Sequence, residues 1–116
     1  MSKSLRAVLV CGGRFHDFDF ARRELLAHLG EDARVRTRVL DDWSRIDAWS
    51  AADFLVTYTC DLRPTAEQGD ALARYVEDGG RWLALHGTNS ILEFDGARVQ
   101  CPRLAPRFMQ TLGSQF

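Results

Sequence analysis

The chain has 116 residues, of which 46% are hydrophobic and 27% are charged. This length is typical of one domain over residues 1–116, and the composition excludes a disordered or fibrous protein. With 15 basic against 16 acidic residues the formal net charge is -1, so electrostatics favour neither nucleic acid nor an anionic membrane as a partner.

The cysteines indicate a cytoplasmic protein. Cys11, Cys60 and Cys101 lie far apart and form no CxxC pair, a pattern that fits a reducing compartment better than a zinc finger or a disulfide framework. The apolar run near the N-terminus ends at a Gly-Gly turn and is too short to span a membrane or to act as a cleavable signal.

The first two elements are predicted to be a strand and a helix. The run from Leu5 to Cys11 is rich in valine and leucine, as in a central parallel strand that is buried on both faces. Residues 18–29 carry apolar side chains at helical spacing, and Gly30 follows them. Asp17 precedes this helix, where a capping role is favoured over a catalytic one.

The middle of the chain predicts an edge strand, a crossover and a third strand. Arginines alternate with apolar residues from Arg34 to Leu40, which is typical of a strand with one wet face at a sheet edge. The stretch WSRIDAWSA predicts a short helix or an irregular crossover whose tryptophans are packing anchors rather than sugar-stacking residues. Residues 54–58, FLVTY, predict the third strand.

The C-terminal half predicts two helices and a fourth strand. In PTAEQGDALARYVEDGG, Thr65 and Gln68 have the spacing of a capping box, and a Gly-Gly pair ends the helix. Residues 82–85 form an apolar strand that ends at His86, and the tail 102–116 predicts a last helix before Gly113.

Alternating strands and helices predict an α/β fold with a mostly parallel sheet in the order 2-1-3-4 and helices on both sides. The fourth strand then forms an apolar edge without protective charges. Such an edge favours pairing. We therefore expect either a homo-oligomer through this edge or a domain that is truncated at its C-terminus.

Four segments, in this order, carry a resemblance to a known family: VLVCGGRFHDF, FLVTYTCD, TAEQGDALARYVEDGG and WLALHGTNS. Together they resemble the trehalose-utilisation (ThuA-like) domain of the class I glutamine amidotransferase-like superfamily, over about Leu5 to Phe116. The resemblance implies a flavodoxin-like three-layer fold and a role in using trehalose or another sugar derivative. Members of that family continue past the LGSQF-like segment into a His-Pro motif and further strands, so it also implies the N-terminal part of a longer domain.

The same resemblance argues against glutamine hydrolysis. Class I glutamine amidotransferases carry a catalytic cysteine where a strand turns into a helix, and the matching position here holds His86 without a neighbouring cysteine. A glutaminase needs a thiolate nucleophile with a positioned base. Cys11 and Cys60 are better interpreted as small buried residues.

Ligands of open parallel sheets bind at the carboxyl ends of the strands, and this edge supplies the candidate site. The candidate catalytic residues are His16, Asp61 and His86. The two histidines could act as general acid and base, or as ligands of a divalent metal that a carboxylate completes. The alternative makes His16 a loop residue and His86 a strand-end residue bonded to backbone.

The remaining candidates would bind the ligand rather than react. They are Gly12, Gly13, Asp17, Thr59, Gly87, Thr88 and Asn89. The glycine pair would let backbone approach a ligand closely, and the amides of a helix beginning after Gly87 would hold an anion or a carbonyl oxygen. A third glycine at dinucleotide-binding spacing is missing from the sequence, so no nucleotide cofactor is expected.

Two functions follow as hypotheses, and a third hypothesis is a remnant fragment without independent activity. The first is a ThuA-like protein that acts on a small sugar derivative. The second is a non-catalytic small-molecule or protein-binding module with the same fold.

Overall fold

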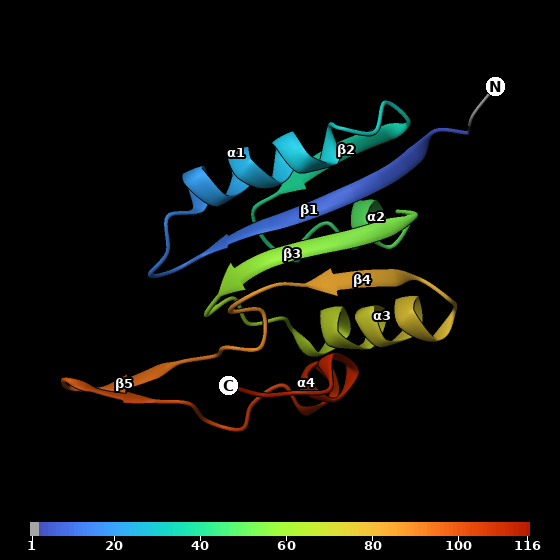
Figure 1. Cartoon of the computed structure of the whole chain (residues 1–116). Helices are drawn as coiled ribbons and strands as arrows, with labels where there is room; N and C mark the ends of the chain where they lie inside the picture. Colours follow the sequence, from blue (N-terminus) through green and yellow to red (C-terminus); the bar gives the residue numbers. More distant parts are fainter. Residues whose placement is uncertain (1–2) are drawn as a thin grey trace.

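A single parallel sheet forms the centre of the molecule. The computed structural model describes residues 3–116, and its four long strands are β1 (Leu5–Gly13), β2 (Val35–Leu40), β3 (Phe54–Cys60) and β4 (Arg81–Ala84). All neighbours pair in parallel, in the order β2-β1-β3-β4 (Figure 1). The predicted strand order is confirmed, with the arginine-bearing strand β2 at one edge and β4 at the other.

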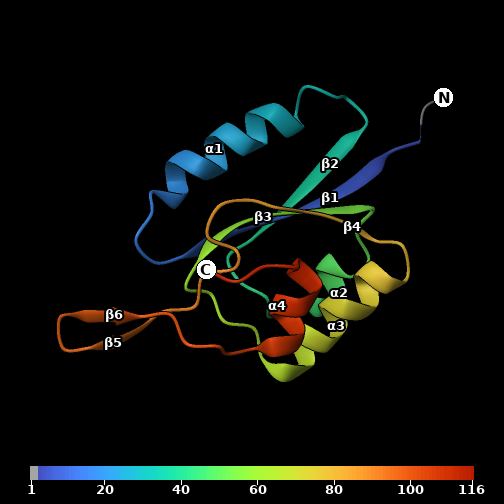
Figure 2. The same ribbon diagram turned by 60° about the horizontal axis from the view of Figure 1, so that its bottom comes forward.

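Helices cover both faces of this sheet. One face carries α1 (Phe18–Leu29), and the other carries α2 (Ile46–Trp49), α3 (Ala66–Glu77) and α4 (Pro106–Leu112) (Figure 2). These three layers and the strand order have the flavodoxin-like arrangement, so the predicted fold class is confirmed. Within residues 3–116, no helix has the length and apolar character needed to cross a membrane.

The helix ends follow the capping signals in the sequence. The Asp17 carboxylate accepts a hydrogen bond from the Phe20 amide at 2.9 Å, which caps α1. Thr65 and Gln68 form the reciprocal capping box of α3, with distances of 2.9 and 3.1 Å. Each bond satisfies an amide that has no partner within the first turn of a helix.

The first strand is longer than predicted. It continues through Gly12 and Gly13, which pair with Thr59 and Cys60 of β3. A side chain on Gly12 would collide with the Asp41 carbonyl, and one on Gly13 with the Cys60 carbonyl. The close packing of the backbone therefore accounts for both glycines, independently of any ligand.

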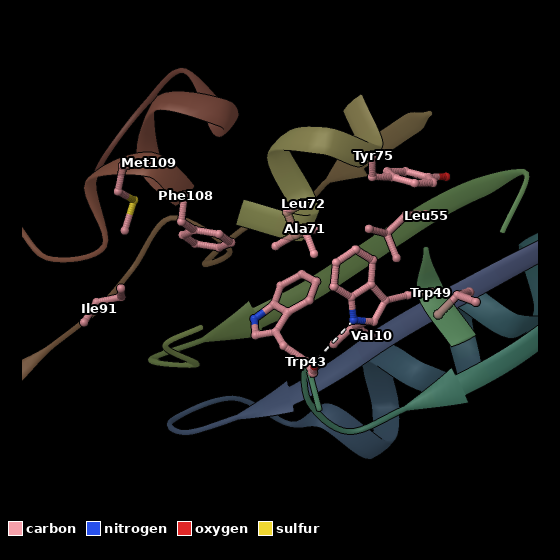
Figure 3. Close-up of a cluster of buried hydrophobic side chains, with 11 residues drawn as sticks. Val10, Trp43, Trp49, Leu55, Ala71, Leu72, Tyr75, Ile91, Phe108 and Met109 are labelled. Carbon is pink, nitrogen blue, oxygen red and sulfur yellow. Dashed lines mark hydrogen bonds between the residues drawn. The ribbon is translucent and has the colours of Figure 1, made fainter. Parts of the chain in front are cut away.

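The larger core lies between the sheet and helices α2, α3 and α4. Trp43, Trp49, Leu72 and Phe108 are almost fully buried there, and the indole nitrogen of Trp49 donates to the Trp43 carbonyl at 3.1 Å (Figure 3). Both tryptophans of the crossover are thus packing anchors, as predicted.

The core under α1 is thinner. Leu9, Cys11 and Val56 are its buried residues, and half-buried side chains of α1 such as Leu25 and Leu26 pack against them. Leu83 of β4 pairs with Val56 and so projects to the same face. It stays 58% exposed, because α1 packs over β1 and β2 rather than over β4 (Figure 2).

An antiparallel hairpin follows β4, and the sequence interpretation did not include it. Its strands are β5 (Glu93–Asp95) and β6 (Arg98–Gln100), and it projects beyond the carboxyl ends of the long strands (Figure 1). The two residues that connect the strands are Gly96 and Ala97, and Gly96 has a φ of 60°. A glycine at the first position of a two-residue connection between short alternating segments is a hairpin signal.

Candidate functional site

Two histidines from different loops stack against each other at the carboxyl edge of the sheet. His16 lies between β1 and α1, whereas His86 lies in the turn after β4. Their ring centroids are 5.0 Å apart and their planes differ by 17°. The strands that precede these loops are separated by β3 in the sheet, so the pair bridges the end of β3.

Two aromatic residues hold this pair in place. Tyr58 of β3 has its ring centroid 5.9 Å from that of His16 and 6.3 Å from that of His86. Phe18, the first residue of α1, stacks on His16 at 6.0 Å and meets Tyr58 edge-on, also at 6.0 Å. The histidines therefore lie on the α1 face of the sheet, where Tyr58 and Phe18 support them.

The pair provides proton donors and acceptors rather than a complete metal site. A neutral imidazole has one donor and one acceptor nitrogen. Two imidazoles side by side can thus take a proton from one ligand atom and give one to another. Residues 3–116 contain no group of three or more His, Cys, Asp or Glu side chains that could hold a metal ion.

Asp61 acts as an anchor for the surrounding loops. One carboxylate oxygen accepts from the Leu92 amide at 2.8 Å and the other lies 3.3 Å from the Arg14 guanidinium. Asp61 also has a φ of 54°, a left-handed conformation that aspartate tolerates better than most residues. Its two oxygens thus tie the loop after β1 to the start of the hairpin.

Cys60 lines the same region but is a poor nucleophile. Burial, and secondarily the Asp61 carboxylate, raises the pKa of its thiol above the usual 9.0. The thiolate, rather than the thiol, is the reactive form of cysteine. Cys11 resembles it, since burial also raises the pKa of the Cys11 thiol.

The helix that the sequence predicted after Gly87 is absent from the described chain, and that prediction is wrong. Residues 86–89 form a turn, and the chain then continues into the hairpin. Gly87 has a φ of 86°, and a side chain there would collide with the Thr59 carbonyl. The Thr88 hydroxyl donates to the Leu85 carbonyl at 2.8 Å, which closes the turn. This corner therefore has no helix N-terminus to bind an anion.

Three other predicted ligand-binding residues, Thr59, Thr88 and Asn89, are buried or hydrogen-bonded elsewhere in the chain. Thr88 is buried and its hydroxyl lies 3.0 Å from that of Thr57. Thr59 is also buried, and it projects to the same face as Thr57 because strand side chains alternate. Its hydroxyl has no hydrogen-bond partner among residues 3–116. The Asn89 side chain donates to the Ser114 hydroxyl at 3.0 Å and so holds the C-terminal segment.

An open groove of about 310 Å³ adjoins the histidine pair. Its walls include His16 and His86 together with Phe15, Phe94 and Val99, of which the last two come from the hairpin. The sequence interpretation missed these apolar residues as well as Tyr58. The glycine of this turn, Gly96, could have indicated the hairpin, but nothing in the sequence indicates that the hairpin projects beside the histidines.

Comparison of the chain with protein-family models, with curated proteins and with solved structures found no match.

Proposed function

We propose that this chain is a ThuA-like domain that binds a small sugar derivative at the carboxyl edge of its sheet, with His16 and His86 in contact with the ligand. The observation that carries the proposal is the stacking of these two rings at 5.0 Å from separate loops. The ligand class, a sugar derivative, is proposed because the segments around both histidines resemble the ThuA-like family. The three free cysteines support a cytoplasmic location.

As an enzyme, the domain would transfer protons. One imidazole would accept a proton from a sugar hydroxyl while the other donates a proton to an oxygen at the reacting carbon. Asp61 would act as a positioning residue, because its oxygens already bind Leu92 and Arg14.

A second candidate, a non-catalytic binding module, has its own support. The raised pKa of the Cys60 thiol leaves the edge without an activated cysteine nucleophile. A site that presents two imidazoles and an apolar wall is equally suited to holding a ligand without reaction.

Proton NMR of the histidine rings tests ligand contact directly. The chain has three histidines, and His28, on the exposed side of α1 near Glu31, serves as an internal control. We expect titration with trehalose, glucose or gluconate to shift the ring signals of His16 and His86 and to leave His28 in place. If none of the sugars moves the first two signals, the proposal fails.

The variant His86→Gln separates the two candidates. For an enzyme, sugar turnover followed by NMR is lost, while the circular dichroism spectrum and the unfolding midpoint stay unchanged. For a binding module, the wild type turns nothing over, and the rise in midpoint with added sugar survives the substitution in part, through His16 and the apolar wall.

A further inference from the structure

Exposed apolar side chains gather at the groove beside the histidine pair. In residues 3–116, seven large apolar residues are exposed, and four of them line this groove: Phe15, Phe94, Val99 and Phe116. Exposed apolar residues that occur singly need no explanation, whereas a cluster on a concave surface indicates a binding site. The groove therefore differs in character from the rest of the surface.

The hairpin presents its apolar face to the groove. Phe94 of β5 pairs directly with Val99 of β6, and both side chains line the groove. Their neighbours Glu93, Asp95 and Arg98 are polar and project to the opposite face, because side chains alternate along a strand. The hairpin is thus an amphipathic wall, with its apolar side toward the histidines.

Phe15 completes this wall from the loop after β1. It has a φ of 73°, a conformation that is unusual for a bulky residue, although its side chain is 57% exposed. Burial of the ring therefore does not account for the strained backbone. The strain orients the ring beside that of Phe94, with the centroids 5.6 Å apart, and strained residues of this kind cluster at ligand sites.

Arg14 fixes the two phenylalanines relative to the histidine loop. Its guanidinium carbon lies 4.7 Å from the ring centroid of Phe15 and 5.5 Å from that of Phe94. The same guanidinium lies 3.3 Å from Asp61. These contacts connect the hairpin, the loop after β1 and the end of β3, and so place the aromatic wall beside His16.

The groove has few hydrogen-bonding groups for a free sugar. Besides the two imidazoles, the side chains of residues 3–116 with a polar atom in the groove wall are those of Ser90 and Cys60. Both side chains are buried. A free disaccharide carries hydroxyl groups on every side, and each hydroxyl that loses water without gaining a partner weakens binding. A ligand with one polar and one apolar end fits these walls better.

We propose that the ligand is an aryl glycoside, whose sugar contacts His16 and His86 and whose aromatic aglycone lies against Phe15, Phe94 and Val99. This inference rests on the proposed function, because the histidines are the sugar-binding end. An aromatic aglycone is favoured over an alkyl chain because rings stack on the faces and edges of the two phenylalanines.

Matched pairs of glycosides test the proposal. Phenyl and methyl glycosides of glucose, galactose and glucuronic acid are titrated into the full chain, and dissociation constants are read from the His16 and His86 ring signals. We expect at least one phenyl glycoside to bind about tenfold or more tightly than its methyl partner. Equal affinities within every pair would overturn the aryl assignment but would leave the proposed sugar site standing. If no glycoside shifts either histidine, both proposals fall.

Variants locate the aglycone. Phe94→Ala and Val99→Ala should each reduce the preference for the phenyl glycoside. Phe20→Ala on α1 and Val76→Ala on α3 replace exposed residues outside the groove and should leave the preference unchanged. A preference that survives both hairpin variants contradicts the proposal.

An exposed apolar surface can also mediate self-association of the chain. Sedimentation velocity distinguishes this alternative from ligand binding. We expect the wild type and Phe94→Ala to have the same oligomeric state in solution. A wild-type dimer that Phe94→Ala dissociates would assign the groove to a second copy of the chain and would overturn the glycoside proposal.

Discussion

The hydrophobic cores on the two faces of the sheet differ in size. On the side of α2, α3 and α4, large side chains such as Trp49 and Leu72 are completely buried. On the other side, all residues of α1 are half-buried or exposed, and the histidine pair lies beyond the helix start. One face thus supplies most of the apolar burial that stabilises the fold, while the other is left accessible at the end where the candidate site lies.

The same substitution on the two faces measures this difference. Leu72→Ala empties a fully buried position of α3 and should lower the free energy of unfolding by about 2–5 kcal/mol. Leu25→Ala on α1 removes a half-buried side chain and should lower it by about 1 kcal/mol. Urea unfolding followed by circular dichroism gives both values, and equal losses would contradict the contrast between the faces.

A polar network within the thicker core gives the next largest effect. The Thr57 hydroxyl accepts from the Trp82 indole at 3.0 Å and lies 3.0 Å from the Thr88 hydroxyl. Thr57→Val removes this partner and should lower the free energy of unfolding by about 1–2 kcal/mol. Thr37→Val on the edge strand β2 is the matched control. An unchanged denaturation midpoint for Thr57→Val would show that the network contributes nothing.

The uncovered part of the α1 face should tolerate a charge. Leu83 of β4 is 58% exposed, so Leu83→Lys should change the free energy of unfolding by no more than about 0.5 kcal/mol. Leu55→Lys, at a fully buried position of β3, is expected to prevent folding. Sedimentation velocity on the Leu83 variant also tests the expected pairing of the β4 edge between copies, because a lysine there would dissociate such a dimer.

The smallest effect concerns an ion pair in the loop between α1 and β2. Hydrogen bonds from the Arg34 guanidinium, and next from the Arg34 amide, lower the pKa of Asp32 from 3.8 to about 2. Because the folded-state pKa is the lower one, the carboxylate stabilises the fold above pH 3.8, and this contribution disappears as the pH falls from 3.8 to about 2. The group is exposed, so solvent and salt keep the contribution small.

The wild type should become less stable as the pH falls from 3.8 to about 2, because Asp32 becomes protonated. Asp32→Asn has no carboxylate to protonate, so its stability should fall less over the same pH range. Unfolding midpoints at several pH values in this window, measured at low salt, provide the comparison. In about 1 M salt the two proteins should become indistinguishable there. Identical pH profiles at low salt would exclude a stabilising role for the pair.

Local signals explain how much of the fold the sequence predicted. The run of apolar residues in β1, the capping residues Asp17 and Thr65, and the alternating arginines of β2 each act within a few positions of the chain. Together with the preference for parallel crossovers they give the strand order. The hairpin was missed although Gly96 is a local turn signal, because its two strands have only three residues each and present weak alternation.

The placement of the candidate residues was predicted in part for a similar reason, while their function stays a prediction. His16 and His86 were assigned to the same sheet edge because both follow parallel strands, and the structure brings their rings together. The helix expected after Gly87 did not form, because the Thr88 side chain closes a turn onto Leu85. Asp61 was expected beside the histidines as a reacting group, but its oxygens bind Leu92 and Arg14.

The sequence by itself determined the four long strands, the main helices, their order and the edge at which polar residues gather, since propensity, periodicity and capping depend on neighbours along the chain. Only the tertiary structure decided which of those residues meet. The stacking of His16 on His86, the support from Tyr58 and the apolar wall of Phe15, Phe94 and Val99 depend on contacts between segments far apart in sequence. Such contacts arise from packing, which no local pattern encodes.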